Sequence, residues 1–164
     1  MRYRRPITGC LEFGNDAWGC LISYVQRSPF AKEAGGVLLG RMVEGTEDIL
    51  IDEVTKPGMH DSRSRFRFMR SRRTAQGLVD KAWQESGRSR IYLGEWHTHP
   101  EDDPRPSNVD EHDRQNVLRS ATYEQGFLFF VIAGCVRVRV WEGSKSGEVS
   151  PCIEVVPVET IAKD

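Results

Sequence analysis

Long hydrophobic runs are absent from this chain of 164 residues. A transmembrane helix needs about 20 consecutive apolar residues, and no stretch approaches that length, so we expect no membrane span. The basic N-terminus, from Met1 to Pro6, is not followed by the apolar stretch of about 7–15 residues that a secretory signal contains. The predicted location of the protein is therefore the cytoplasm.

Cysteine is scarce and widely spaced. The sequence contains 4 cysteines and no C-x-x-C pair, which argues against a zinc ribbon and against a thioredoxin-like redox motif. In a cytoplasmic protein we expect all of them to be free thiols. They are Cys10, Cys20, Cys135 and Cys152.

A strong net charge is also absent. The formal net charge is −1, so we expect no global electrostatic attraction to nucleic acid or to a membrane surface. The sequence shows no glycine-rich phosphate loop, no dinucleotide-binding fingerprint and no internal repeat. Nucleic acid is therefore not an expected partner.

Alternating and short apolar stretches predict the strands of a mixed sheet. The run Val37-Leu38-Leu39 is continuously apolar, as expected for a strand that is buried on both faces. In the stretch from Cys135 to Trp141, Val136, Val138 and Val140 are expected on one face and the intervening arginines on the other. The predicted strands cover residues 7–13, 37–39, 49–54, 66–69, 92–96, 126–133, 135–141 and 151–158. Residues 159–164 are expected to be unstructured or frayed.

Three helices are predicted from caps and apolar periodicity. The first follows Asn15 or Asp16 and ends before Pro29, the second follows Ser71, and the third runs from Ser107 to about residue 120. The expected fold class is therefore α+β with an α/β layout, in which helices flank a mixed β-sheet. We expect one domain over residues 1–164, with a core over about 7–142 and a C-terminal strand over about 151–158.

Most of the chemically active side chains lie between Gly94 and Asp113. A strand enters this stretch, and His97 and His99 are two residues apart, so both side chains point to the same face of the strand. Prolines at 100, 104 and 106 interrupt regular structure across the next seven residues. Ser107 then opens a helix and Asp110 lies in its first turn, so the turn brings a carboxylate back toward the imidazoles.

Two imidazoles and a carboxylate can supply three ligands to a zinc ion, and catalytic zinc sites keep a fourth position for water. Each half of the stretch also has a simpler interpretation. A His-x-His pair on an edge strand can be solvated, and Ser107 with Asp110 forms a plain capping box that needs no metal. The combination favours a metal site, because either interpretation explains only one half of the pattern.

Arginines are concentrated between residues 63 and 73, where six occur. Phe66 and Phe68 alternate with Arg65 and Arg67, which predicts a strand with one basic face. Arg65, Arg67 and Arg70 are therefore candidates for contacting an acidic partner or a chain terminus. A solvated basic face remains the alternative.

Glu33 lies just before Gly35-Gly36 and the apolar strand that follows. Glycines at the start of a strand permit the close approach of another backbone or of a ligand. From this segment alone, Glu33 would be interpreted as a solvated surface carboxylate.

Together with the His-x-His stretch, Glu33 completes a pattern that resembles the JAB1/MPN/Mov34 metallopeptidases, also called JAMM proteases. That family's pattern is a glutamate near a Gly-Gly strand, followed by His-x-His, seven residues, serine, two residues and aspartate. The matching positions in this chain are Glu33, His97, His99, Ser107 and Asp110. The order of elements is also similar across about residues 7–142.

The resemblance implies a role for each of these residues. His97, His99 and Asp110 would bind one Zn²⁺ per chain, Glu33 would act as general acid and base, and Ser107 would steady the tetrahedral intermediate. Zinc lowers the pKa of its bound water from about 15.7 toward about 7. A nearby carboxylate can take the proton of that water, and a hydroxyl donor to the oxyanion can contribute ~3 kcal/mol.

Within the family, the chain looks most like a bacterial branch of deconjugating peptidases from antiphage cyclic-oligonucleotide signalling (CBASS) operons. The implied activity is zinc-dependent hydrolysis of the amide or isopeptide bond after the flexible C-terminal tail of a conjugated protein. The implied substrate is a cGAS-like nucleotidyltransferase joined to a target lysine, and the implied partner is a ubiquitin-transfer-like (E1/E2-like) enzyme. Such a tail could add as a strand at Val37–Gly40 or at Phe66–Met69.

Two other functions remain open. The chain could be a non-catalytic MPN-type scaffold, although a scaffold has no need of all five matched residues. It also resembles a JAB domain linked to DNA repair in bacteria, in which case the arginine run would contact phosphates with strongly salt-dependent affinity. The near-neutral net charge argues against that possibility.

Overall fold

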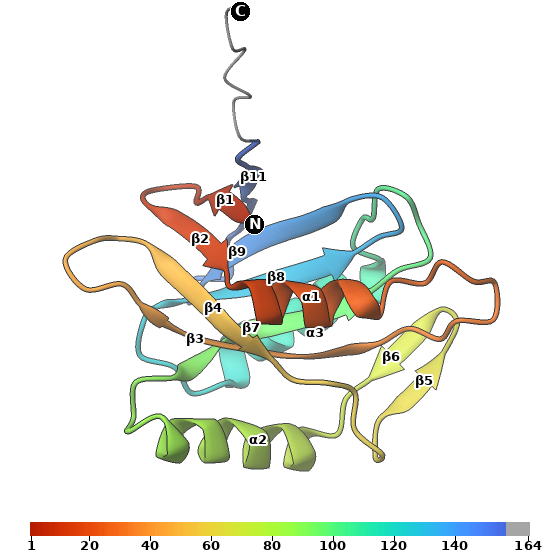
Figure 1. Ribbon diagram of the computed structural model, residues 1–164, viewed down its shortest axis with the longest axis horizontal. Helices are drawn as coiled ribbons and strands as arrows, with labels where there is room; N and C mark the ends of the chain where they lie inside the picture. Colours follow the sequence, from red (N-terminus) through yellow and green to blue (C-terminus); the bar gives the residue numbers. More distant parts are fainter. Residues whose placement is uncertain (157–164) are drawn as a thin grey trace, which may run out of the picture.

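A mixed sheet forms the centre of the protein in the computed structural model, which describes residues 1–156 (Figure 1). Nine strands of this part of the chain pair in one sheet, and two of the pairings, β2 with β4 and β7 with β8, are parallel. In spatial order the strands are β10 (Val149–Pro151), β9 (Val138–Ser144), β8 (Phe127–Ala133), β7 (Ile91–Thr98), β3 (Gly35–Met42), β4 (Ile49–Val54), β2 (Cys10–Phe13), β1 (Arg2–Arg4) and β11 (Ile153–Glu154). A separate hairpin consists of β5 (Ser62–Ser64) and β6 (Arg67–Met69).

Helices cover both faces of the sheet, which confirms the α+β prediction. Helix α1 (Asn15–Ser23) lies in front of the sheet in Figure 1, and its Ala17 and Leu21 are buried in the largest core cluster. Helix α2 (Arg72–Glu85) packs with Val37 and Leu39 of β3. Helix α3 (Asn108–Ser120), behind the sheet, packs with β8 through Leu118. Helices α2 and α3 begin at the predicted caps, Ser71 and Ser107. The cap predicted at Asn15 or Asp16 is wrong, because α1 follows an N-cap at Gly14 that makes no side-chain hydrogen bond.

The sheet curls, so that strands from its two ends approach each other. Tyr3 of β1 is 2% exposed, and its hydroxyl donates to the carbonyl of Val138 in β9 at 3.1 Å. Arg5 donates to both carboxylate oxygens of Glu142 at 2.9 and 3.0 Å and to the carbonyl of Glu47 at 2.8 Å. These contacts join the N-terminal hairpin to β9.

Short segments of the N-terminal half differ from the sequence predictions. The strand predicted over residues 7–13 begins only at Cys10, because Gly9, with a φ of 72°, lies in the turn that connects β1 to β2. The β1 strand itself was not predicted. Its single buried side chain, Tyr3, stands between two arginines, so the segment carries no apolar pattern.

The C-terminal strand predicted over residues 151–158 is interrupted and shorter in its described part. Pro151 ends β10 and Ile153–Glu154 form β11 at the opposite edge of the sheet, and Cys152 between them is buried. Residues 157–158 of that prediction and the tail 159–164 lie outside the described residues. The extent of the single domain over residues 1–164 stays a prediction.

The orientation predicted for Val136 is also wrong, because this side chain is 74% exposed. The backbone amides of Val136 and Arg137 donate to the carbonyl of Asp102 instead of pairing with β8. Strand β9 therefore starts at Val138, and Val138 and Val140 are buried as expected.

A β-bulge at Gly94 sets which face of β7 each side chain occupies. Against β3 the register shifts, so that Leu38 lies opposite Gly94 and Leu39 opposite Tyr92. Gly94 has a φ of 138°, and a Cβ there would lie 1.9 Å from the carbonyl oxygen of Phe129. Because of this extra residue, Leu93 and Trp96 both join the core beneath α1. The side chains of Tyr92, Glu95 and His97 consequently face the opposite side.

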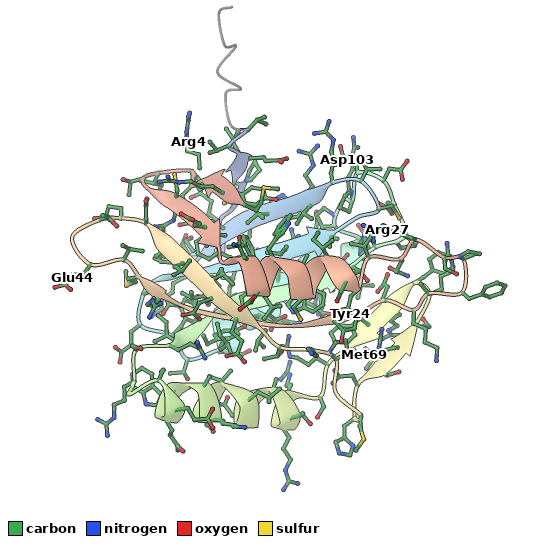
Figure 2. All side chains as sticks on the ribbon, in the orientation of Figure 1. Arg4, Tyr24, Arg27, Glu44, Met69 and Asp103 are labelled. Atoms are coloured by element: carbon green, nitrogen blue, oxygen red, sulfur yellow. The ribbon has the colours of Figure 1, made fainter. Side chains whose placement is uncertain are left out.

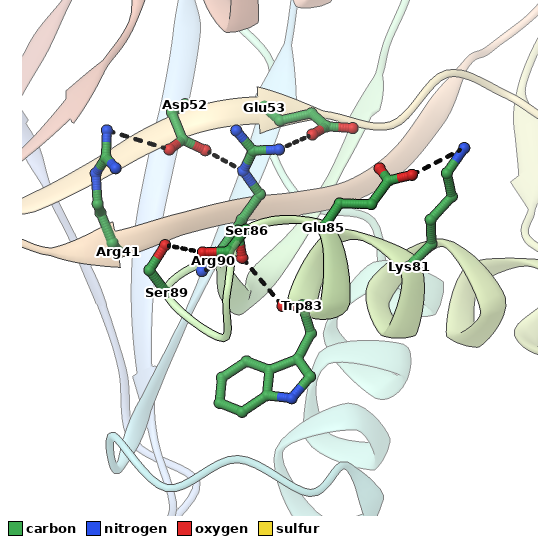
Figure 3. Close-up of polar contacts among 9 residues, drawn as sticks. All are labelled: Arg41, Asp52, Glu53, Lys81, Trp83, Glu85, Ser86, Ser89 and Arg90. Carbon is green, nitrogen blue, oxygen red and sulfur yellow. Dashed lines mark hydrogen bonds and ion pairs between the residues drawn. The ribbon is translucent and has the colours of Figure 1, made fainter.

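Polar contacts fix the turn between α2 and β7 (Figure 3). Arg90 donates to Asp52 at 2.8 Å and to Glu53 at 2.6 Å, which ties the start of β7 to β4. At the other end of β4, a polar turn joins β3 to β4, with Glu44 at its tip (Figure 2). Among the described residues, no helix combines the length and apolar character that crossing a membrane requires.

Candidate metal centre

Three side chains that are separated in sequence converge on one point. His97 Nε2 lies 3.1 Å from His99 Nε2 and 3.2 Å from Asp110 Oδ1, and His99 Nε2 lies 3.3 Å from Asp110 Oδ2. His97 comes from β7, His99 directly follows that strand, and Asp110 comes from the first turn of α3. The structure therefore brings together the three ligands predicted from the sequence.

The distances between these donor atoms fit a metal ion. Tetrahedral zinc holds nitrogen and oxygen ligands at about 2.0–2.1 Å, which places neighbouring ligand atoms about 3.3 Å apart. The three observed separations lie close to that value. Hydrogen bonds from the two imidazoles to Asp110 explain two of these separations but not the one between the imidazole nitrogens, whereas one central cation accounts for all three.

The electrostatic environment keeps the carboxylate ionised. Burial alone would raise the pKa of Asp110, but hydrogen bonds from His97 and His99 hold it well below its usual range. Burial opposes a charge on His99, yet its hydrogen bond with Asp110 raises the pKa of that imidazole above the ordinary value. A cation at this point is therefore met by a charged oxygen ligand.

Ser107 caps α3 and also contacts Asp110, one of the three candidate metal ligands. Its hydroxyl and its backbone amide both lie 2.7 Å from Asp110 Oδ2, and the amide of Asp110 points back to Ser107 Oγ at 3.2 Å. The predicted capping box is thus present. The capping interaction and the metal site share one carboxylate, so the two interpretations of this motif are compatible.

Glu33 lies at one end of the same cleft and is only 5% exposed. Burial raises the pKa of Glu33 to about 7, while His99 and a backbone hydrogen bond from Phe68 act to lower it. The interpretation of Glu33 as a solvated surface carboxylate is therefore wrong. A buried carboxyl with a pKa near neutrality can both accept and release a proton.

A buried glutamine connects the segment that carries Glu33 to the strand that carries the histidines. Gln26 is 2% exposed, and its amide group donates to the carbonyls of Ala31 at 3.1 Å and Arg65 at 2.9 Å. Its oxygen accepts from the hydroxyl of Thr98, which in turn accepts from the amide of Ala34. Sequence analysis did not identify Gln26, because its partners lie up to 72 positions away and no local pattern indicates them.

The β5–β6 hairpin holds the backbone of Glu33 from the other side. Arg63 Nε donates to the carbonyl of Glu33 at 2.7 Å, and the amide of Glu33 donates to the carbonyl of Ser64 at 2.7 Å. Gly35 permits this approach, since a Cβ there would lie 2.4 Å from the ring of Phe68. The position of Glu33 is therefore set by the hairpin and by β7 together.

The arginine run does not form one continuous basic face. Arg65 donates to the carbonyls of Ser28 and Pro29, so its guanidinium holds a loop. Arg70 forms an ion pair with Glu95 inside the cleft. Arg67 is exposed and lines the cleft. The predicted role of Arg65, Arg67 and Arg70 in substrate binding stays a prediction.

The two stretches proposed to receive a substrate strand differ. Val37–Gly40 lies within β3, which is paired with β7 on one side and with β4 on the other, so the prediction of a free edge there is wrong. In the described structure, β6 pairs only with β5, and Phe66–Met69 lines the cleft. The order of the strands, which local sequence does not show, therefore leaves Phe66–Met69 as the stretch with an open edge in the described structure.

The cleft has a volume of about 730 Å³ and extends well beyond the metal group. It is lined by β6, by β7 and β8, by α3, and by the segments that carry Glu33 and Ser107. Glu33 lies at the level of His99 along β7, because Gly35 pairs with His97 in the antiparallel register. The other end of the cleft reaches Phe130 of β8 and Arg114 of α3.

Comparisons with known proteins agree with this geometry. The family model described as prokaryotic homologs of the JAB domain matches residues 21–144. A CD-NTase/cGAS isopeptidase from Vibrio cholerae is 34% identical over 130 residues, covering 79% of this chain and 78% of the relative. A CD-NTase/cGAS isopeptidase from Pseudomonas aeruginosa is 34% identical over 146 residues, covering 88% and 90%.

A solution structure of a protein from Desulfitobacterium hafniense shares the fold, with a TM-score of 0.60 at 20% identity over 86% of this chain and 88% of that one. The family match covers most of the chain and includes His97, His99 and Asp110. The chain therefore belongs to the prokaryotic JAB family, and it is a hydrolase of the JAMM type.

Proposed function

We propose that this protein is a zinc-dependent isopeptidase that releases a conjugated protein from its target by hydrolysing the amide bond after a C-terminal tail. The observation that carries the proposal is the convergence of His97, His99 and Asp110 beside the buried carboxyl of Glu33 in one cleft. The identity of the metal as zinc rests on the nitrogen and oxygen donors and on their spacing.

The residues of the chain have distinct tasks in this reaction. A zinc ion held by His97, His99 and Asp110 would supply a water of lowered pKa and would polarise the scissile carbonyl. Glu33 takes a proton from the attacking water and delivers it to the leaving amine. Ser107 donates its hydroxyl hydrogen to the developing oxyanion, which requires its hydroxyl to turn away from Asp110. Water adds across the amide, so the products are a carboxylic acid and an amine.

The proposed substrate is a conjugated CD-NTase, a cGAS-like nucleotidyltransferase, because two relatives named for that activity align with most of this chain. Its flexible tail would lie along the cleft, and the free edge of β6 offers backbone groups to it. A ubiquitin-transfer-like (E1/E2-like) enzyme would make the conjugate that this protein removes. In that setting the activity would serve bacterial antiphage defence.

Metal analysis of the purified protein beside the Asp110→Ala variant tests the centre. We expect about one zinc per chain in the wild type and a large loss in the variant, because one of three protein ligands is removed. Glu44→Ala, at the tip of the β3–β4 turn, is the matched control and should keep the metal. A wild-type protein that binds no zinc when the ion is supplied contradicts the proposal.

Hydrolysis distinguishes the enzyme from a non-catalytic scaffold. The zinc-loaded wild type should cleave a CD-NTase tail joined through an isopeptide bond to a lysine peptide, and Glu33→Ala should bind zinc without cleaving it. Equal turnover by the two proteins would remove Glu33 from the mechanism.

A further inference from the structure

Arg114 is a buried cation that has no hydrogen-bonding partner among residues 1–156. It lies four residues after Asp110 on α3 and is 6% exposed. Its guanidinium stacks over Trp141 at 4.3 Å and over Phe130 at 5.6 Å from the ring centroids. One of its terminal nitrogens is buried and has no hydrogen-bond partner, and no ion pair involves Arg114 in the described part of the chain.

Arg5, another buried arginine, has the carboxylate partner that Arg114 lacks in the described structure. Arg5 is 8% exposed and also stacks on an aromatic ring, that of Phe127, at 4.3 Å. Its guanidinium donates to both oxygens of Glu142 and to a backbone carbonyl. Buried charges in folded proteins are ordinarily compensated in this way. Arg114 has the aromatic contacts but lacks the carboxylate.

Arg114 keeps its charge at neutral pH: Asp110 and Glu111 act against the effect of burial, although neither forms a hydrogen bond or ion pair with it in the described structure. Burial lowers the pKa of Arg114 to about 10, so the side chain stays protonated. The same cleft contains a second buried nitrogen that has no hydrogen-bond partner in the described structure, Nε of Arg70. Another nitrogen of Arg70 pairs with Glu95. Both groups line the cleft that contains the metal ligands.

The register of the sheet locates Arg114 relative to the reaction. Phe130, beneath Arg114, pairs with Glu95 in β7, two residues before His97. Glu33 lies at the opposite end, at the level of His99. Since Glu33 must face the leaving amine, the acyl side of the substrate extends the other way, toward Arg114.

We propose that Arg114, assisted by Arg70, forms a subsite that receives a carboxylate side chain, Asp or Glu, of the substrate's acyl tail. An extended chain rises about 3.3 Å per residue, so an offset of two residues along β7 places this acidic residue about two positions before the scissile bond. The charge of Glu95 is already balanced by Arg70 and by the hydroxyl of Tyr92. This subsite rests on the proposed isopeptidase function and specifies what its substrate carries.

The decisive measurement compares acidic and neutral tails. Octapeptides joined through an isopeptide bond to a lysine peptide would carry one Glu or one Gln at each of the four positions before the bond. With the zinc-loaded wild type we expect kcat/KM to be at least about tenfold higher for Glu than for Gln at one position near the second. In Arg114→Met the ratio of the Glu value to the Gln value should fall to about one.

Controls separate a subsite from a structural role. The Arg119→Met variant changes an exposed arginine five residues further along α3 and should keep the Glu preference. Arg114→Met should not lower the melting temperature, because methionine can pack on the rings without a buried charge. A Glu preference that is absent at all four positions, or one that survives in Arg114→Met, overturns the proposal. A fall in activity that is equal for Glu and Gln peptides also overturns it, because it indicates a contact with the substrate backbone.

Peptide binding tests the acidic subsite even if the protein hydrolyses none of the conjugates. Calorimetry with the corresponding unconjugated octapeptides, which end in a free carboxylate, should show tighter binding of the Glu form to the wild type and equal binding to Arg114→Met. If none of the conjugates is cleaved but this preference is seen, the isopeptidase proposal fails and the acidic subsite stands. If conjugates are cleaved without any preference in cleavage or binding, the subsite fails alone.

Discussion

Buried polar groups differ between two regions of the molecule, the candidate active-site cleft and the junction where the two ends of the sheet meet. At the junction, Arg5 finds Glu142 and a backbone carbonyl, so the protein completes every interaction itself. In the cleft, the three candidate metal ligands face one another around a point suited to a cation, and Arg114 has no partner among the described residues. Groups of the first kind stabilise the fold, whereas we propose that groups of the second kind are completed by something that the protein binds.

The largest expected effect belongs to the cleft and concerns catalysis alone. Replacing Glu33 by alanine should reduce kcat by about 10²–10⁴-fold, the range for loss of general acid–base catalysis. Zinc content and melting temperature should not fall, because Glu33 is not among the grouped ligands and its carboxyl is costly to bury. Single-turnover kinetics with elemental analysis check this prediction. A variant that has lost its metal would place Glu33 among the ligands.

At the junction the opposite outcome is expected. Arg5→Met should lower the free energy of unfolding by about 3–5 kcal/mol, because Glu142 is left buried without its partner. The activity of the protein that remains folded should be unchanged. Urea denaturation measures the effect, and Arg2→Met, which breaks the exposed pair with Asp48, is the control, with an expected loss of about 0–1 kcal/mol. Equal losses in the two variants would remove the distinction between the regions.

Metal removal should connect the cleft to stability. An ion that binds only the folded chain stabilises it by about 4 kcal/mol when its free concentration is 1,000 times the dissociation constant. Zinc added to the metal-free protein should therefore raise the melting temperature, and His97→Ala should abolish that rise. Calorimetric scans with and without zinc provide the test. A zinc response that persists in His97→Ala would place the binding site elsewhere.

The smallest of these effects on stability is expected for Gln26, whose side chain is hydrogen-bonded within the protein, as at the junction, but supports the segment that carries Glu33. Gln26→Met preserves the volume of the side chain but leaves Thr98 and two carbonyls without their partner, which should cost about 1–3 kcal/mol. The segment that carries Glu33 then loses one of its anchors, and kcat should fall more than KM rises. Gln76→Met, on the exposed face of α2, is the control. A stable variant with normal kcat would show that the hairpin contacts alone position Glu33.

The sequence predicted the convergence of the candidate metal ligands better than it predicted the short strands around them. The His97, His99 and Asp110 group depends on a strand, a turn and a helix cap, all of which are local. Gln26 and Arg114 were not identified, because the sequence near a polar side chain does not show whether distant segments will bury it. Gln26 is buried by residues far away in the sequence, and Arg114 is packed on aromatic rings of β8 and β9. The choice between Val37–Gly40 and Phe66–Met69 as a free edge could not be made from the sequence for a related reason, since the order of strands is a property of the whole sheet.

The bulge at Gly94 makes the metal centre depend on the length of β7. Side chains alternate between the two faces of a strand. Removal of this one residue would therefore move the side chains either before it or after it to the opposite face of the sheet. If the C-terminal half of the strand rotated, His97 would turn into the core and Trp96 would emerge into the cleft. A single-codon deletion at this position is therefore expected to disable the protein more completely than most substitutions. Relatives and designed variants should tolerate changes of residue type along β7 far better than insertions or deletions.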